Sequence, residues 1–170
     1  MTTVGHSLAG VSIAVLTLPR GRTLLWYLIV GHLYVFFANL PDFPLPGWGH
    51  DAYQVSHSIF VTSLLLPLLA LPLLLPKFKA QVSTAVVLAW SGTWLCHMLL
   101  DSLYSHGEGI GIFWPLSDAH LALPVPWFET LQWPARTAHN AHVFQIELLN
   151  YGLLLAACIG LRWLWVRAQR

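Results

Sequence analysis

Residues 96–106 read CHMLLDSLYSH and end one of the most apolar segments of the chain. The segment has the composition of a lipid-embedded helix, yet it ends in two histidines and a carboxylate. Each of these groups costs free energy to bury without a partner. His97 and Asp101 are four residues apart, so on a helix they project from one face and can hold one ion. The stretch therefore predicts a membrane helix that carries part of a metal site at its end.

The composition of the 170-residue chain is that of an integral membrane protein. Only 9% of its residues are charged and 56% are hydrophobic, whereas soluble domains carry about 25% charged residues. The length suits one integral membrane domain over residues 1–170, without a second soluble domain. The net charge of +1 and the lack of a basic run argue against nucleic acid and leave membrane lipids as expected partners. No basic region precedes the first apolar segment, so no cleavable signal peptide is expected.

Five apolar segments predict an all-α, polytopic membrane helix bundle. A transmembrane helix takes about 17 to 25 residues, and the bundle has four spans if the short first segment does not cross. The segments are residues 4–18, 24–40, 58–75, 82–104 and 146–165.

The basic residues divide unevenly between the two ends of this bundle. With five spans, all Lys and Arg residues except Arg136 fall on one side. Basic loops are retained in the cytoplasm, which predicts a cytoplasmic C-terminus and an extracytoplasmic N-terminus in the cell inner membrane. The acidic residues and all histidines except His32 then lie on the extracytoplasmic side.

Three further stretches bring metal-binding residue types to that side. GHSLAG places His6 at the outer end of the first segment, LPDF places Asp42 after the second, and SHS places His57 before the third. Gly107 is expected to end the fourth helix near Ser105, which lets the next residue fold back toward the site. The candidate metal ligands are therefore His6, Asp42, His57, His97, Asp101 and His106.

Nitrogen and carboxylate ligands without thiolates suit Zn, with Mn and Fe as alternatives. One or two ions are expected. Six ligands exceed one tetrahedral site, which makes two ions with a bridging carboxylate plausible, and Asp101 is the candidate bridge.

Several polar residues also have a purely structural interpretation. His97 and Asp101 could form a hydrogen bond that pins two helices, and Asp42 could cap a helix. Ser56 and Ser58 are candidates for helix caps or for hydrogen bonds that orient a ligand. His32 is expected to be a buried packing residue. Loop roles are expected for His50, Asp51, Glu108, His139, His142 and Glu147.

These motifs resemble the YdjM-type membrane-bound metal-dependent hydrolases. The resemblance spans residues 5–118, and its most specific part is HMLLDSLYSHGEGIGIFWPLSD at residues 97–118. The order of histidines and aspartates is also similar to that of zinc-dependent phospholipases C. The resemblance implies that the same six residues bind metal, with Asp101 and His106 at the catalytic centre. The chain departs from these patterns in Pro44, where the family has a second aspartate, and in the spacing of His142 and Glu147.

The function predicted from the sequence is a membrane-bound hydrolase that uses a metal-activated water against an ester or phosphoester. The level of the site at the membrane surface favours a lipid or lipid-linked substrate. No nucleophile-elbow motif is visible, which disfavours a covalent serine mechanism. Three alternatives remain open: a haem protein with His32 and His97 as axial ligands, an ion transporter, and a metal-binding protein without catalytic activity.

Overall fold

The computed structural model describes residues 1–43, 55–105, 109–134 and 137–169. Within these ranges the protein is all-helical and contains no strand, so the predicted all-α class is confirmed. The α-helices are α1 (Thr3–Thr17), α2 (Leu24–Asn39), α3 (Ile59–Ala70), α4 (Pro76–Gln81), α5 (Thr84–Asp101) and α6 (Ala138–Ala168). The 3₁₀ helices η1 (Leu40–Asp42) and η2 (Leu71–Leu74) follow α2 and α3.

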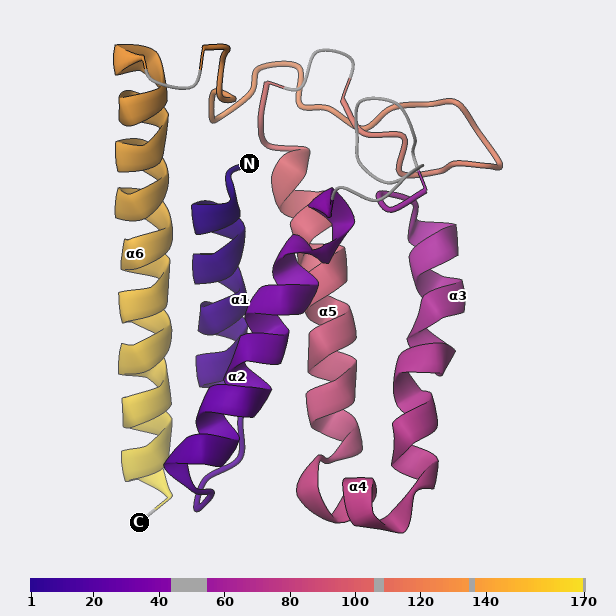
Figure 1. The fold of residues 1–170 in the computed structure, drawn as a ribbon. Helices are drawn as coiled ribbons and strands as arrows, with labels where there is room; N and C mark the ends of the chain where they lie inside the picture. The colour runs from indigo at the N-terminus through magenta and orange to yellow at the C-terminus, as the bar shows by residue number, and fades with distance from the viewer. Residues whose placement is uncertain (44–54, 106–108, 135–136, 170) are drawn as a thin grey trace.

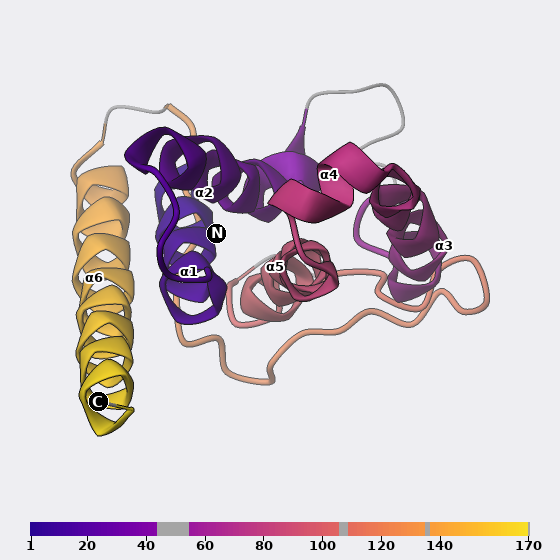
Figure 2. The same cartoon turned by 90° about the horizontal axis from the view of Figure 1, so that it is seen from below.

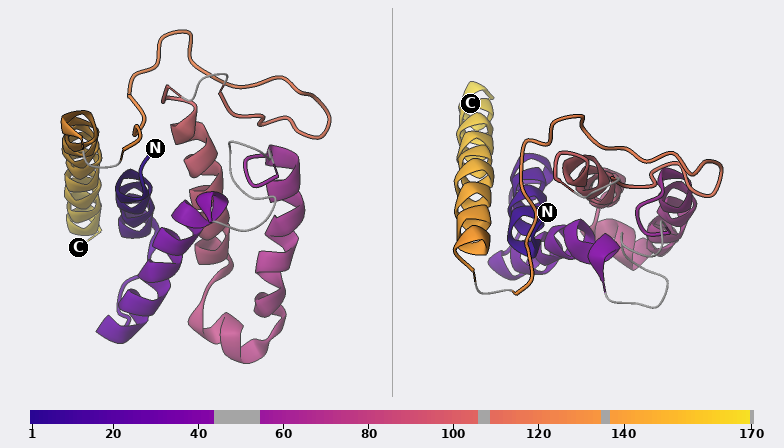
Figure 3. Two further views of the ribbon diagram at one scale, coloured as in Figure 1. Left: turned by 45° about the horizontal axis from the view of Figure 1, so that its top comes forward. Right: turned by 90° about the horizontal axis from the view of Figure 1, so that it is seen from above.

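Helix α1 lies at the centre of the bundle. It packs against α6 on one side and α2 on the other, and α5 contacts both α1 and α2. Helix α3 lies outermost against α5, and α4 connects the lower ends of these two helices (Figures 1 and 2). The described parts of the connection between α5 and α6 pass over the upper end of the bundle (Figure 3). The start of α1 and the ends of α2 and α5 lie at that same upper end (Figure 1).

Each long helix begins at a hydroxyl cap. In every case the side-chain oxygen accepts a hydrogen bond from a backbone N–H of the first turn, which satisfies donors that have no partner within the helix. The capping residues are Thr2, Thr23, Ser58, Ser83 and Thr137.

Helix α6 begins at Ala138, earlier than the predicted start at residue 146. The Thr137 cap fixes this start, and the Asn140 side chain accepts from the Gln132 N–H at 2.8 Å and donates to the Gln132 carbonyl at 2.7 Å. The expected loop placement is therefore wrong for three residues that lie on α6: His139, His142 and Glu147.

Helix α5 ends at Asp101, before the predicted end near Ser105. The backbone N–H of Ser102 donates to the Met98 carbonyl, and its hydroxyl donates to the Leu99 carbonyl at 2.6 Å. These bonds close the last turn of the helix, so the carboxylate of Asp101 sits at the helix terminus.

Among the residues that the structure describes, two stretches are long and apolar enough, by length and composition alone, to cross a membrane: Leu24–Asp42 and Ala138–Ala168. Helix α1 is apolar but shorter. The third predicted segment is divided, because α3 contains Pro67 and Pro72 lies at the start of η2. Every predicted apolar segment thus corresponds to helical structure, and two of them meet the criteria for a span.

An aromatic core joins α2 to α5. The ring of Trp90 packs on those of Phe37 and Tyr34, with centroids 5.9 and 6.3 Å apart. Trp94 and Met98 extend this core along α5 toward the upper end and are almost fully buried. The core fixes the ends of α2 and α5 relative to each other.

Small residues allow α1 to approach its neighbours closely. A Cβ atom added at Gly10 would lie 2.8 Å from the Tyr34 carbonyl oxygen of α2, and one added at Gly5 would lie 2.8 Å from a Glu147 carboxylate oxygen of α6. Close contact of this kind is how helices in membranes gain packing energy. A larger residue at either glycine would push α1 away from a neighbouring helix.

We expect Gly10→Ala to lower the free energy of unfolding by about 1 to 3 kcal/mol, because the added methyl overpacks a contact with backbone atoms. The matched control is Gly92→Ala on α5, where nothing lies within 4 Å of the added Cβ. Helix propensity alone then leaves stability unchanged or raises it by up to about 1 kcal/mol. Unfolding of both variants in mixed micelles measures the difference. Equal effects of the two substitutions would contradict the close packing of α1 on α2.

Candidate metal centre

Five of the six candidate ligands meet at the upper end of the bundle. His6 comes from the first turn of α1, Asp42 from η1, and His57 from the turn before α3, while His97 and Asp101 come from the last turns of α5. Four distant parts of the chain thus contribute to one cluster.

The sixth candidate, His106, lies outside the described residues, as do His50, Asp51 and Glu108.

One half of the cluster joins two histidines to both carboxylates. The Nε2 atoms of His57 and His97 lie 3.2 Å apart. They lie 3.4 and 3.2 Å from Asp101 Oδ2, and 3.5 and 3.6 Å from Asp42 Oδ1. Four donor atoms therefore face one another across nearly equal distances.

The other half of the cluster uses the remaining oxygen atoms of the same two carboxylates. His6 Nε2 lies 3.2 Å from Asp101 Oδ1 and 3.5 Å from Asp42 Oδ2. The α-amino group of Met1 also lies 2.8 Å from Asp101 Oδ1. Each carboxylate thus directs one oxygen toward His57 and the other toward His6, the arrangement of a carboxylate that bridges two ions.

The hydrogen bonding of His97 shows that these facing atoms need a cation or additional protons. His97 Nδ1 lies 2.6 Å from the Ala38 carbonyl oxygen, which can only accept, so Nδ1 carries a proton. In a neutral ring Nε2 then presents a lone pair to the oxygens of Asp42 and Asp101. Lone pairs that face one another at this distance repel unless a metal ion or a proton lies between them.

His6 provides a second indication. It is 1% exposed, and neither of its ring nitrogens makes a hydrogen bond, although its ring stacks on that of His97 at a centroid distance of 3.6 Å. A buried polar atom without a hydrogen bond costs about 1 to 3 kcal/mol. A metal ion bound to Nε2 removes that cost for one of the two nitrogens.

The spacing of the donor atoms fits a small divalent ion. Two ligand atoms about 2.0 to 2.1 Å from one tetrahedral zinc ion lie about 3.3 Å apart, close to the distances observed among His57, His97 and the two carboxylates. One ligand atom from each of His6, Asp42, His97 and Asp101 lies within 4.8 Å of all the others. The group could therefore hold a metal ion, and its nitrogen and oxygen donors are of a kind that binds Zn, Mn or Fe.

Neighbouring groups fix the orientation of the ligands. The Ser56 hydroxyl lies 3.0 Å from His57 Nδ1, and the Ser56 carbonyl accepts from Trp94 Nε1 at 3.0 Å. Ser58 instead caps α3 and donates to the Trp114 carbonyl. The two roles expected of these serines, orienting a ligand and capping a helix, are thus divided between them.

The burial of the cluster is uneven. His6, His57, His97 and Asp101 are at most 1% exposed, whereas the Asp42 side chain is 28% exposed. Solvent therefore reaches the cluster on the side of Asp42.

Glu147 is a buried carboxylate that the sequence interpretation placed in a loop. It is 0% exposed and accepts hydrogen bonds from both the backbone N–H, at 2.9 Å, and the hydroxyl of Thr2. The Tyr104 hydroxyl donates to the Tyr151 hydroxyl at 3.3 Å. These contacts hold the start of α1, one turn before His6. An acidic residue inside an apolar segment is the signal that could have identified Glu147.

Two other histidines also differ from expectation. His32 is exposed on α2, not buried, and its Nδ1 lies 2.6 Å from the Leu28 carbonyl oxygen. His139 connects α6 to the preceding chain, because its Nε2 lies 2.9 Å from the Thr130 carbonyl oxygen. Neither residue lies among the described ligands.

Comparison with known proteins identifies the family. The model of the YdjM inner membrane protein family matches residues 1–168, nearly the whole chain. The match confirms the resemblance carried by the sequence motifs and shows that the protein belongs in the inner membrane. The family description gives a location and no reaction. Searches of curated proteins and of solved structures gave no match.

We expect detergent-purified protein to retain one or two equivalents of Zn, Mn or Fe, and Asp101→Asn to lose most of this metal, because Asp101 faces all three histidines. Elemental analysis measures the content. Glu129→Gln is the matched control, since Glu129 is a 65% exposed carboxylate paired with His139. If wild-type protein is metal-free and takes up none on reconstitution, His97 and Asp101 form a helix-pinning pair instead of a metal site.

Proposed function

The chain belongs to the YdjM inner membrane protein family, and on that premise we propose that it is a membrane-bound, metal-dependent hydrolase of esters or phosphoesters. The observation that carries this proposal is the cluster of three imidazoles and two carboxylates, in which each histidine Nε2 lies 3.2 to 3.6 Å from an oxygen of each carboxylate.

The division of the carboxylate oxygens supports two metal positions. His57 and His97, with Oδ1 of Asp42 and Oδ2 of Asp101, would hold one ion. His6, with the other two oxygens, would hold the second. Both aspartates would then bridge, which extends the bridging role expected of Asp101 alone. Zn is the first choice, and Mn and Fe suit the same donors.

A bound divalent ion supplies Lewis-acid activation of water and of the scissile ester or phosphoester group. The protein contributes fixed geometry: the Ala38 carbonyl holds the tautomer of His97, and Ser56 orients His57. Burial of the three histidines keeps bulk water away from their nitrogens. Asp42, the only partly exposed ligand among the described residues, marks the side from which substrate would approach. His106 remains a candidate for completing the second position and for catalysis.

A five-span topology with the cluster on the extracytoplasmic side is part of the proposal. Its support is the separation of charge along the bundle: Arg20 and Arg22 lie between α1 and α2, Lys77 and Lys79 lie on α4, and Arg162 lies toward the end of α6, all at the lower end in Figure 1. The cluster lies at the upper end. Basic segments favour the cytoplasm, which puts the metal centre at the outer surface and near lipid substrates.

Reporter fusions test this topology. We expect an alkaline phosphatase fusion in the α5–α6 connection, after Asp118, to be active, and one after residue 170 to be inactive, because phosphatase folds only outside the cytoplasm. Green fluorescent protein at the same two positions should give the opposite pattern. A fluorescent fusion at Asp118 would place the metal centre on the cytoplasmic side.

The geometry favours hydrolysis over the haem alternative. His97 directs one nitrogen to Ala38 and the other to the carboxylates, so neither is directed at His32, which lines a separate groove on α2. The alternative that keeps the cluster intact is a metal-binding protein without catalytic activity, and an activity assay separates the two.

We expect purified protein in lipid nanodiscs to hydrolyse at least one member of a panel of chromogenic phosphoesters, carboxylic esters and lipid phosphoesters. Chelation should abolish the activity, and added Zn or Mn should restore it. His57→Ala should lower kcat/KM by about 100-fold or more, because an imidazole that would bind the metal is lost. His32→Ala is the control and should retain full activity.

Metal-loaded protein that hydrolyses nothing on the panel would favour the non-catalytic alternative. Activity that survives both chelation and His57→Ala would contradict the proposed site.

A further inference from the structure

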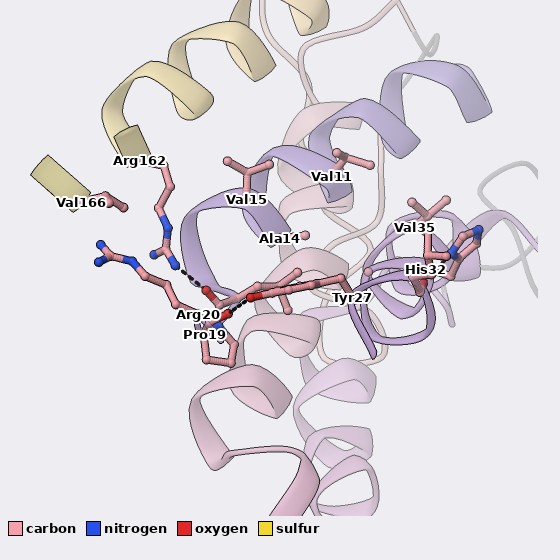
Figure 4. Close-up of a pocket in the computed structure, with 13 residues that line it drawn as sticks. Val11, Ala14, Val15, Pro19, Arg20, Tyr27, His32, Val35, Arg162 and Val166 are labelled. Carbon is pink, nitrogen blue, oxygen red and sulfur yellow. Dashed lines mark hydrogen bonds between the residues drawn. The ribbon is translucent and has the colours of Figure 1, made fainter. Parts of the chain in front are cut away.

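A groove of about 600 Å³ lies along α1, and none of the five clustered ligands is among its lining residues (Figure 4). Its floor is the lower half of α1, including Val11, Ala14 and Val15, and its sides are α2 and α6. Most of its lining is aliphatic. Ala14 and Gly31 are small residues in this lining. The groove is open at Gly31, because nothing lies within 4 Å of a Cβ added there.

Two arginines stand at the lower end of this groove. Arg20 and Arg162 both line it, and their guanidinium carbons lie 5.1 and 4.8 Å from the centroid of the same Trp165 ring. Arg162 is held in place because it donates to the carbonyls of Leu16 at 3.1 Å and Leu18 at 2.6 Å.

Neither arginine has an anionic partner within the part of the chain that the structure describes. The acidic side chains there belong to the opposite end of the bundle or to the connection above it, whereas Arg20 and Arg162 converge on one indole. Both guanidinium groups are positive and pack on the same indole, and a phosphate bound to them would be stabilised by charge-assisted hydrogen bonds. The groove therefore combines an apolar channel with an anion-binding end.

We propose that this groove binds one anionic phospholipid of the inner membrane. Its phosphate lies between Arg20 and Arg162, and an acyl chain runs up the channel past Ala14 and Gly31. The channel follows α1 from its C-cap Leu18 up to Val11, a rise of about 10 Å, so it accommodates a chain segment and not only a headgroup. Anionic lipids concentrate on the membrane surface that basic residues face, which matches the end at which the arginines stand.

A second copy of this chain is a poorer occupant. The outer face of α6 is rich in exposed leucine, such as Leu153 and Leu161, and could fill the apolar channel. It offers no anion to Arg20 and Arg162. Charge complementarity therefore selects the phospholipid, and oligomeric state distinguishes the two occupants in the experiment.

Native mass spectrometry of the full-length protein with phosphatidylglycerol or phosphatidylcholine tests the proposal. We expect a single tightly retained phosphatidylglycerol and weaker retention of phosphatidylcholine. Arg20→Gln should weaken phosphatidylglycerol binding about fivefold, because one basic residue at the headgroup is lost. Gly31→Leu should weaken it at least as much, since the new side chain enters the channel without a clash at Cβ.

Two control variants isolate the groove. Arg167→Gln removes an equal charge at the same end of the bundle, but Arg167 is on α6, its guanidinium carbon lies 3.8 Å from the centroid of the Trp163 ring, and it does not line the groove. Gly92→Leu adds the same side chain where space is open on α5. Both should change lipid binding by less than about twofold.

Equal losses of phosphatidylglycerol binding in the groove variants and the control variants would show that the lipid is general annular lipid, and would overturn the proposal. A dimer that Gly31→Leu dissociates, with no headgroup preference, would assign the groove to a second copy. Lipid retention is measured without bound metal or turnover, so this result is independent of the proposed hydrolase activity.

Discussion

The upper half of this structure depends on one constraint, which is that a carboxylate buried at the end of an apolar helix needs partners. Asp101 is 1% exposed, and an ionised carboxylate in such a place requires cationic or hydrogen-bonding partners. His6 and His57 from two other parts of the fold, His97 from the preceding turn of α5, and the α-amino group of Met1 meet it. To bring these groups and Asp42 together, α2 must end at η1, the chain must turn before α3, and α1 must start beside the end of α5. The helix termini are therefore positioned by the cluster as much as by their own caps.

The sequence predicted this cluster well because its chemistry is visible at single positions. A histidine or aspartate at the end of an apolar segment is unusual enough to be informative, and the spacing of His97 and Asp101 already specifies a shared helical face. The order of the segments then brings His6, Asp42 and His57 to the same level. Whether these residues bind metal is a separate matter, which the geometry supports and metal analysis would decide.

Other features depend on contacts that one sequence does not reveal. The early start of α6 follows from the bonds between Asn140 and Gln132, residues of a type common in any polar loop. The burial of Glu147 follows from its contact with Thr2, on the far end of the chain. His32 was expected to be buried because it lies inside an apolar helix, but its burial depends on which face of α2 meets a neighbour. Helical periodicity is weak in α2, where nearly every position is apolar, so the sequence could not distinguish these faces.

Contacts at the two ends of α1 relate the metal centre to the groove. Helix α6 contacts the two ends of α1 through opposite charges. At the N-terminus of α1 the Glu147 carboxylate accepts a hydrogen bond from Thr2, and at its C-terminus the Arg162 guanidinium donates to the Leu16 and Leu18 carbonyls. An anion at a helix N-terminus and a cation at its C-terminus both interact favourably with the helix dipole. Because the two helices run in the same direction, the spacing of Glu147 and Arg162 along α6 matches the length of α1. The helix that carries His6 is thus held in register at both ends, although it is short for a membrane span. Its glycines bring it close to α2 and α6 at the upper end, and the separation of α2 from α6 at the lower end leaves the groove.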